Sequence, residues 1–110
     1  TPTLTNTTNV AASTAYAFQW SRVGNTITFS GEVDIDPTTT ATLTVLTFTL
    51  PVVGSFGNTF ECAGTAADDL GTPARVAATV SAGTAQVRLT PLDVTNRRFS
   101  VHGTYQYIAL

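Results

Sequence analysis

The sequence predicts an all-β fold, an antiparallel β-sandwich of jelly-roll-like form with about seven or eight strands. Three observations support this fold class. Apolar and polar side chains alternate along most of the chain, turn residues recur every 8–12 residues or so, and no helical period persists beyond one turn. The 110 residues are enough for a single domain, residues 1–110, with a core of its own.

A β-hairpin over residues 16–36 is the clearest element. Gly24 and Asn25 form its two-residue turn, because glycine accepts a positive φ freely and asparagine tolerates one. The resulting register pairs Val23 with Thr26, Trp20 with Phe29, Phe18 with Gly31, and Tyr16 with Val33. Phe18 is expected to cover the gap at Gly31. Opposed residues share a face, so we expect a core face made of Tyr16, Phe18, Trp20, Ile27, Phe29, Val33 and Ile35.

Shorter strands and loops account for the rest of the chain. Residues 6–14 read as a polar linker, and the further strands expected are 2–5, 42–50, 60–66, 75–81, a segment carrying Val87 and Leu89 inward, and 99–110. Val76, Ala78 and Val80 are expected to point inward, before a turn at residues 82–84. In 42–50 the apolar residues change face between Val45 and Leu46. Either a β-bulge restores one core face, or both faces are buried, one of them against another subunit.

Charge and cysteine content exclude several classes of protein. Only 11% of residues are charged, the net charge is −2, and all five cations are arginines. Such a chain lacks the basic patches that bind nucleic acid through its phosphates. No apolar run approaches the ~20 residues of a membrane span, so we expect no membrane insertion. Cys62 is the one cysteine and is expected to be a buried thiol.

The residues that could carry chemistry have structural interpretations that we favour. Glu32, Asp34 and Asp36 lie along one straight strand, which spreads carboxylates instead of converging them on Ca²⁺. His102 is the single histidine, and no nucleophile motif accompanies it, so we assign it to the surface or an interface. We therefore predict a non-enzymatic protein without catalytic residues, metal or cofactor.

Aromatic residues and two charged doublets remain as candidates for ligand contact. Tyr16, Trp20, Tyr105 and Tyr107 could form a platform on which sugar rings stack, although the alternation favours core burial for most of them. Asp68-Asp69 and Arg97-Arg98 lie in predicted loops, where ligand contacts concentrate, and each doublet is equally typical of a solubilising turn.

A pattern spanning nearly the whole chain resembles a known family. It comprises TPTLT at residues 1–5, YAFQW at 16–20, RVGN at 22–25 followed by ITFSG at 27–31, Leu50-Pro51, and FSVHGTY at 99–105. These segments are similar to the C-terminal tip domain of tailed-bacteriophage tail fibres and tailspikes. The resemblance implies a trimeric β-sandwich at the virion tail tip. It also implies that the chain is the C-terminal part of a longer one, and that any depolymerase activity belongs to an upstream domain.

Under this resemblance the expected function is trimerisation and attachment to a host-surface glycan receptor. Tip loops at residues 36–40, 53–58, 68–73 and 92–98 would face the receptor, with Asp68, Asp69, Arg97 and Arg98 as candidate glycan contacts. Small apolar residues on otherwise polar faces are candidate subunit-interface positions, namely Ala17, Val23, Ala63, Ala77 and Ile108. The alternative function is a monomeric carbohydrate-binding module from a secreted bacterial enzyme.

Overall fold

The computed structural model describes residues 1–52, 56–79 and 83–107. Over these ranges the chain forms nine β-strands, one short 3-10 helix and no α-helix, which confirms the predicted all-β class with one strand more than the upper prediction. The strands are β1 (Leu4–Thr8), β2 (Val10–Ala15), β3 (Gln19–Val23), β4 (Thr26–Pro37), β5 (Thr44–Thr49), β6 (Cys62–Ala67), β7 (Ala74–Ala78), β8 (Thr84–Leu89) and β9 (Arg97–Gln106). The 3-10 helix η1 covers Thr59–Glu61.

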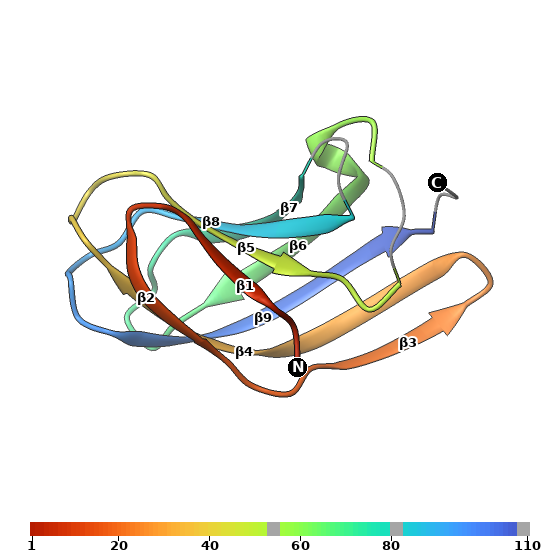
Figure 1. The fold of residues 1–110 in the computed structure, drawn as a ribbon, viewed down its shortest axis with the longest axis horizontal. Helices are drawn as coiled ribbons and strands as arrows, with labels where there is room; N and C mark the ends of the chain where they lie inside the picture. The colour runs from red at the N-terminus through yellow and green to blue at the C-terminus, as the bar shows by residue number, and fades with distance from the viewer. Residues whose placement is uncertain (53–55, 80–82, 108–110) are drawn as a thin grey trace.

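All neighbouring strands are antiparallel and belong to one continuous sheet. Its order is β1-β5-β8-β7-β6-β9-β4-β2, and β3 pairs with the first half of β4. The sheet folds over into two facing layers, which brings β1 and β2 from its two ends close together (Figure 1). Asn9 links these two strands with a positive φ of 57°. The result is a nearly closed, sandwich-like barrel.

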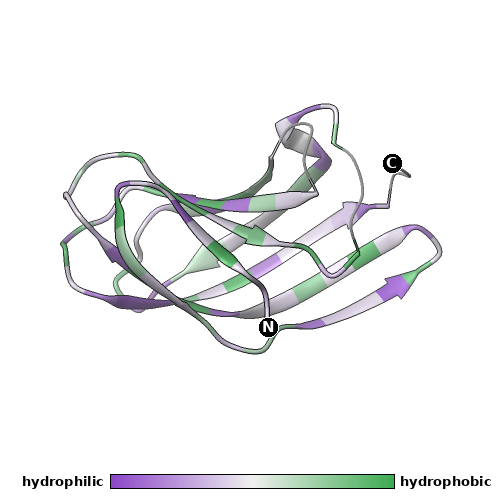
Figure 2. Cartoon of the chain, viewed as in Figure 1, coloured by the Kyte–Doolittle hydropathy of each residue, from purple (hydrophilic) through white to green (hydrophobic). Residues whose placement is uncertain are grey.

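The core fills the space between the two layers. Burial alternates strictly along β9, from Phe99 through Val101 to Tyr105, and Figure 2 shows hydrophobic and hydrophilic residues alternating along the strands. This is the pattern expected of a sheet with one dry and one wet face. The buried core cluster comprises Ile27, Phe29, Val33, Ile35, Leu46, Phe48, Leu50, Phe56, Cys62, Ala66, Val76, Ala78, Ala85, Val87, Leu89, Phe99, Val101 and Tyr105.

The predicted hairpin turn and its register are confirmed. Val23 pairs with Thr26 and Trp20 with Phe29. Gly24 has φ of 60° while Asn25 stays out of the positive region, as in a type II′ turn. Phe18 covers Gly31 so closely that a Cβ there would overlap its ring.

Beyond Phe18 the predicted register is wrong by one residue. Ala15, not Tyr16, opposes Val33, because the chain leaves the strand conformation between β2 and β3 and rejoins β4 one residue out of phase. The backbone N–H of Tyr16 donates to the Glu32 carbonyl at 3.2 Å. A one-residue shift reverses every side chain, so Tyr16 faces outward and not into the core.

Trp20 is also placed differently from the prediction. Its side chain is 51% exposed, although it lies on the same face as Phe29. The reason is the position of β3, which pairs only with β4 and has five exposed residues. Among the described residues, both faces of this strand are therefore largely open to solvent. In contrast, the expectation of core burial is met by Tyr105, whose hydroxyl donates to the Val52 carbonyl at 2.7 Å.

Residues 6–14 form strands instead of the predicted polar linker. They occupy most of β1 and β2, which add to the open edges of β5 and β4. A sheet edge presents unpaired backbone N–H and C=O groups, and these can pair with a further strand whether its side chains are polar or apolar. Because most side chains here are exposed, the hydrophobic alternation that identifies a strand is absent.

Each of the two predicted explanations for the change of face between Val45 and Leu46 is correct in part. β5 pairs with β8 without interruption, and the register shift lies in β1, where Asn6 opposes Leu46 and Thr8 opposes Val45. Leu46 belongs to the core cluster, while Val45 is buried on the other face of β5 within the single chain. The bulge therefore lies in the partner strand.

Cys62 is a buried thiol, as predicted. It begins β6 after the turn of η1, and burial raises its pKa to about 12. Residues 59–61 form a 3-10 turn where the sequence predicted the start of a strand. Val80 and Ile108, for which an inward and an interface position were predicted, lie outside the described residues.

Candidate functional site

Three of the four predicted tip loops meet at one end of the barrel. Backbone hydrogen bonds connect them to each other, from Ala41 N to Pro91 O at 3.1 Å and from Thr90 N to Pro73 O at 3.2 Å. A further bond, from Thr38 N to Asn9 O at 3.0 Å, joins the first loop to the link between β1 and β2. Among the described residues, four of the six exposed large hydrophobic side chains lie at this loop end, namely Leu43, Leu70, Leu92 and Val94. The fourth loop follows Val52, and the Tyr105 hydroxyl holds Val52 near the opposite end of β9. Residues 53–55 of this loop lie outside the described residues.

Asp68 organises the turn that precedes β7. Its Oδ1 accepts hydrogen bonds from the backbone N–H groups of Leu70 and Thr72, both at 3.0 Å, and its Oδ2 accepts one from the Thr72 hydroxyl. Burial alone would raise the pKa of Asp68, but the hydrogen bonds from Thr72 and Leu70 outweigh it and the pKa is lowered. This carboxylate is thus occupied within its own loop.

Arg97 joins two loops through its carboxylate partners. Its Nη2 lies 2.6 Å from Asp93 Oδ2, and its Nη1 lies 3.8 Å from Asp69 Oδ1. The hydrogen bond from Arg97 lowers the pKa of Asp93, and the Thr95 backbone N–H contributes to the same shift. The guanidinium is therefore neutralised by the chain itself.

Arg98 points to the opposite face of the sheet from Arg97. Its Nε donates to Asp34 Oδ1 at 3.0 Å, and its Nη2 donates to the Tyr16 hydroxyl at 2.6 Å. The Tyr16 hydroxyl in turn donates to Asp34 Oδ2 at 2.7 Å, and the Arg98 guanidinium lies 4.3 Å from the Tyr16 ring centroid. These bonds lower the pKa of Asp34, with the Arg98 hydrogen bond as the largest cause. The network holds Tyr16, the residue directly after β2, against β4 and β9.

The structure therefore separates the four predicted contact residues into two places. Asp68, Asp69 and Arg97 gather at the loop end, and Arg98 lies on the outer face beside Asp34. The prediction that Arg97 and Arg98 lie in a loop is wrong, because both pair with β4 as the first residues of β9. Three of the four engage partners that already satisfy much of their charge, whereas Asp69 is largely exposed.

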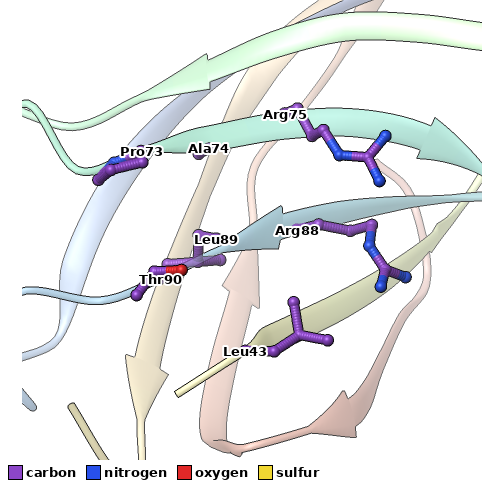
Figure 3. Close-up of a pocket in the computed structure, with 7 residues that line it drawn as sticks. All are labelled: Leu43, Pro73, Ala74, Arg75, Arg88, Leu89 and Thr90. Atoms are coloured by element: carbon purple, nitrogen blue, oxygen red, sulfur yellow. The ribbon is translucent and has the colours of Figure 1, made fainter. Parts of the chain in front are cut away.

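A second arginine pair forms a site that the sequence analysis missed. Arg75 on β7 and Arg88 on β8 are directly opposed in the strand register. Both side chains extend along the same side of the sheet (Figure 3). They border an open groove of about 360 Å³ between β7, β8 and the start of β5, lined by Leu43, Pro73, Ala74, Arg75, Arg88, Leu89 and Thr90.

No carboxylate compensates these two charges within the described residues. The ion pairs of the described chain involve Arg97 and Arg98, and none involves Arg75 or Arg88. Arg88 Nη1 donates to the Gln86 amide oxygen at 2.9 Å, whereas the Arg75 guanidinium donates to no side chain or carbonyl among the described residues. Like charges placed directly opposite each other across a strand pair are unfavourable. The arrangement therefore presents free N–H donors to an anion.

Sequence reasoning could have placed both side chains on the outer face but not side by side. The inward phase of Val76, Val87 and Leu89 implies that Arg75 and Arg88 point outward. A turn centred on Gly83 would have paired Arg88 with Ala78. The strands instead pair Ala78 with Ala85, which brings the two arginines together.

The outer face of β4, β9 and β6 carries hydroxyl groups and the histidine. His102 is exposed, and its Nε2 lies 2.9 Å from the Ser100 Oγ, a neighbour two residues along the same strand. A serine–histidine pair needs an orienting carboxylate and oxyanion donors before it can transfer acyl groups. The described residues show no carboxylate bonded to His102. They also contain no cluster of three or more metal-ligating side chains, so Glu32, Asp34 and Asp36 do not converge.

The predicted subunit-interface residues have different exposures. Val23 is 78% exposed, and Ala17 and Ala63 are exposed as well. Ala77 is 1% exposed, so its methyl group is already covered within the single chain. Trp20 borders a second groove, of about 170 Å³, together with Pro2, Phe18 and Pro51.

A comparison with models of known protein families found no match, and no similar protein was found among curated proteins or among solved structures. In the described residues, no helix has the length and apolar character needed to cross a membrane.

Proposed function

We propose that this chain is a non-catalytic domain of a bacteriophage tail fibre or tailspike, which assembles as a trimer and attaches the virion to a host-surface glycan. The proposal begins from the residue pattern of the hairpin and the closing strand, which resembles the tip domains of such fibres. The antiparallel sandwich agrees with that class of domain, although many unrelated proteins share the architecture.

The exposed strand β3 is the observation that carries the proposal. It projects Trp20 and Val23 into solvent, although the core of the single chain is complete without them. One edge of β3 pairs with β4, and no strand in the described chain pairs with the other. An exposed edge with large apolar side chains invites a second chain. Copies arranged around a three-fold axis would bury this strand.

Light scattering after size-exclusion chromatography tests the assembly. The expected mass at micromolar concentration is three times the 11.5 kDa of one chain. Trp20→Ala and Val23→Glu should shift the mass towards one chain, because each removes apolar surface from the interface. Val94→Glu is the matched control, since Val94 is a comparably exposed apolar residue at the loop end, and it should leave the trimer intact. A wild-type mass of one chain would contradict the proposal.

The same Trp20 supports a second candidate function, a monomeric carbohydrate-binding module. A half-exposed indole beside Pro2, Phe18 and Pro51 offers a flat face on which a sugar ring can stack. Under this alternative the wild-type mass is that of one chain. Trp20→Ala then abolishes glycan binding while the unfolding temperature stays nearly constant, because the side chain is outside the core.

A further inference from the structure

We propose that the groove between Arg75 and Arg88 binds the carboxylate of an acidic sugar, such as a uronic or sialic acid residue in a surface glycan. This inference rests on the glycan-attachment part of the proposed function and names the class of glycan. It concerns a different surface from β3, because the groove lies on the outer side of β5, β7 and β8.

The charge of the groove selects an anion. Opposed residues in a strand pair have Cβ atoms about 5 Å apart, and Figure 3 shows both guanidinium groups reaching the same way. Arg88 uses one N–H on Gln86, while Arg75 uses none on any described residue. Guanidinium forks match the geometry of a carboxylate through paired N–H···O bonds. One carboxylate between the two forks would relieve their mutual repulsion.

The remaining walls select a sugar over a free inorganic ion. Leu43 is 48% exposed and lines the groove together with Pro73, so the groove has apolar as well as charged walls. The exposed Thr90 adds a hydroxyl group. A sugar acid has a carboxylate, an apolar ring face and hydroxyl groups within one small unit, whereas sulfate or phosphate leaves the apolar wall unused.

The scale of the site argues against a polyanion bound through many phosphates. Two arginines are the only cations that line the groove, and the chain has a net charge of −2. Nucleic-acid binding requires several phosphate contacts. A ligand with one carboxylate per sugar is better matched to this surface.

Calorimetric titration of the folded chain tests the proposal. The probes are a galacturonic acid trisaccharide, sialyllactose, the galacturonic acid trisaccharide with its carboxyls reduced to alcohols, and sodium sulfate. We expect at least one acidic sugar to bind, with an affinity that falls as salt rises, and the reduced sugar and sulfate to bind at least about tenfold more weakly. Arg75→Gln and Arg88→Gln should each weaken acidic-sugar binding about tenfold, and the double variant should abolish it.

Glu32→Gln is the control, because it also changes the net charge by one, at an exposed residue of β4 away from the groove. It should bind the acidic sugar like the wild type. Thermal unfolding without ligand separates a binding role from a structural one, since relief of like-charge repulsion leaves the double variant at least as stable as the wild type. A loss of stability in that variant, together with unchanged sugar affinity, would overturn the assignment.

Three other results would also overturn it. These are failure of both acidic sugars, equal binding of the reduced sugar, and equal or tighter binding of sulfate. Light scattering keeps this test apart from the assembly test. A trimer that binds no acidic sugar contradicts the assignment of the groove but not the proposed assembly. A monomer that binds an acidic sugar contradicts the proposed assembly but not the assignment of the groove. Dissociation of the trimer in Arg75→Gln/Arg88→Gln would assign the groove to subunit contact instead.

Discussion

Two pairs of arginines in this chain relate sequence to space in opposite ways. Arg97 and Arg98 are consecutive, yet they point to opposite faces of β9 and each reaches its own carboxylate. Arg75 and Arg88 are separated by most of a hairpin, yet they lie directly opposite each other and have no carboxylate partner in the described chain. The pair that the sequence makes conspicuous stabilises the fold, and the pair that only strand register creates is open to a ligand.

The largest expected effect concerns the network around Arg98. Asp34→Ala removes the acceptor of both Arg98 and Tyr16, and the Asp34 side chain is 15% exposed. Hydrogen bonds to a charged group in such a setting contribute appreciably, so we expect the free energy of unfolding to fall by about 1–2 kcal/mol. Urea denaturation measures it. Asp36→Ala is the control on the same strand, and a loss as large in that variant would show that the network has no special role.

A smaller effect is expected at Arg97, and it should depend on pH. Asp93→Asn weakens the ion pair at the loop end, so the midpoint of thermal unfolding should fall by a few degrees at pH 7. The pKa of Asp93 is lowered by Arg97 in the folded state. Its stabilisation is therefore present above the ordinary aspartate pKa of about 3.9 and is lost as the pH falls through the lowered value.

Thermal unfolding measured from about pH 2 to about pH 7 checks this behaviour, because that range includes the aspartate pKa of about 3.9. The wild-type and Asp93→Asn curves should converge below about pH 4. Arg75→Gln should run parallel to the wild type over the whole range, because Arg75 has no carboxylate partner. A constant gap between the first two curves would mean that the ion pair contributes nothing measurable.

The smallest effect should have the opposite sign. Arg75→Glu converts the opposed arginines into an opposed ion pair with Arg88, which makes this pair resemble Arg97 and its carboxylates. We expect a gain of roughly 0.2–1 kcal/mol in the free energy of unfolding. High salt should erase most of it. A destabilised variant would indicate that Arg75 already has a favourable role, and the contrast between the two arginine pairs would fail.

Much of the fold follows from the sequence alone because side-chain direction in a strand is a local property. The two-fold alternation correctly assigned Phe29, Val33 and Ile35 to the core, and likewise Val87 and Leu89. The Gly24 turn and the register next to it were also predictable, because a two-residue loop allows only one register between its flanking strands.

Pairing between distant segments was decided by the tertiary structure. Nothing local to residues 6–14 shows that they complete the edges of β5 and β4, and nothing local to Trp20 shows that β3 remains uncovered. The one-residue shift before Gln19 turned Tyr16 outward, where Asp34 and Arg98 hold it.

The sequence by itself determined that this is an acidic all-β domain, and which side of most strands is dry. The three-dimensional fold decided which outward residues become neighbours, and with that the candidate site at Arg75 and Arg88. The physical reason is that the face of a residue depends on backbone geometry within a strand. Neighbourhood across strands depends on loop lengths and on hydrogen bonds between segments far apart in the chain.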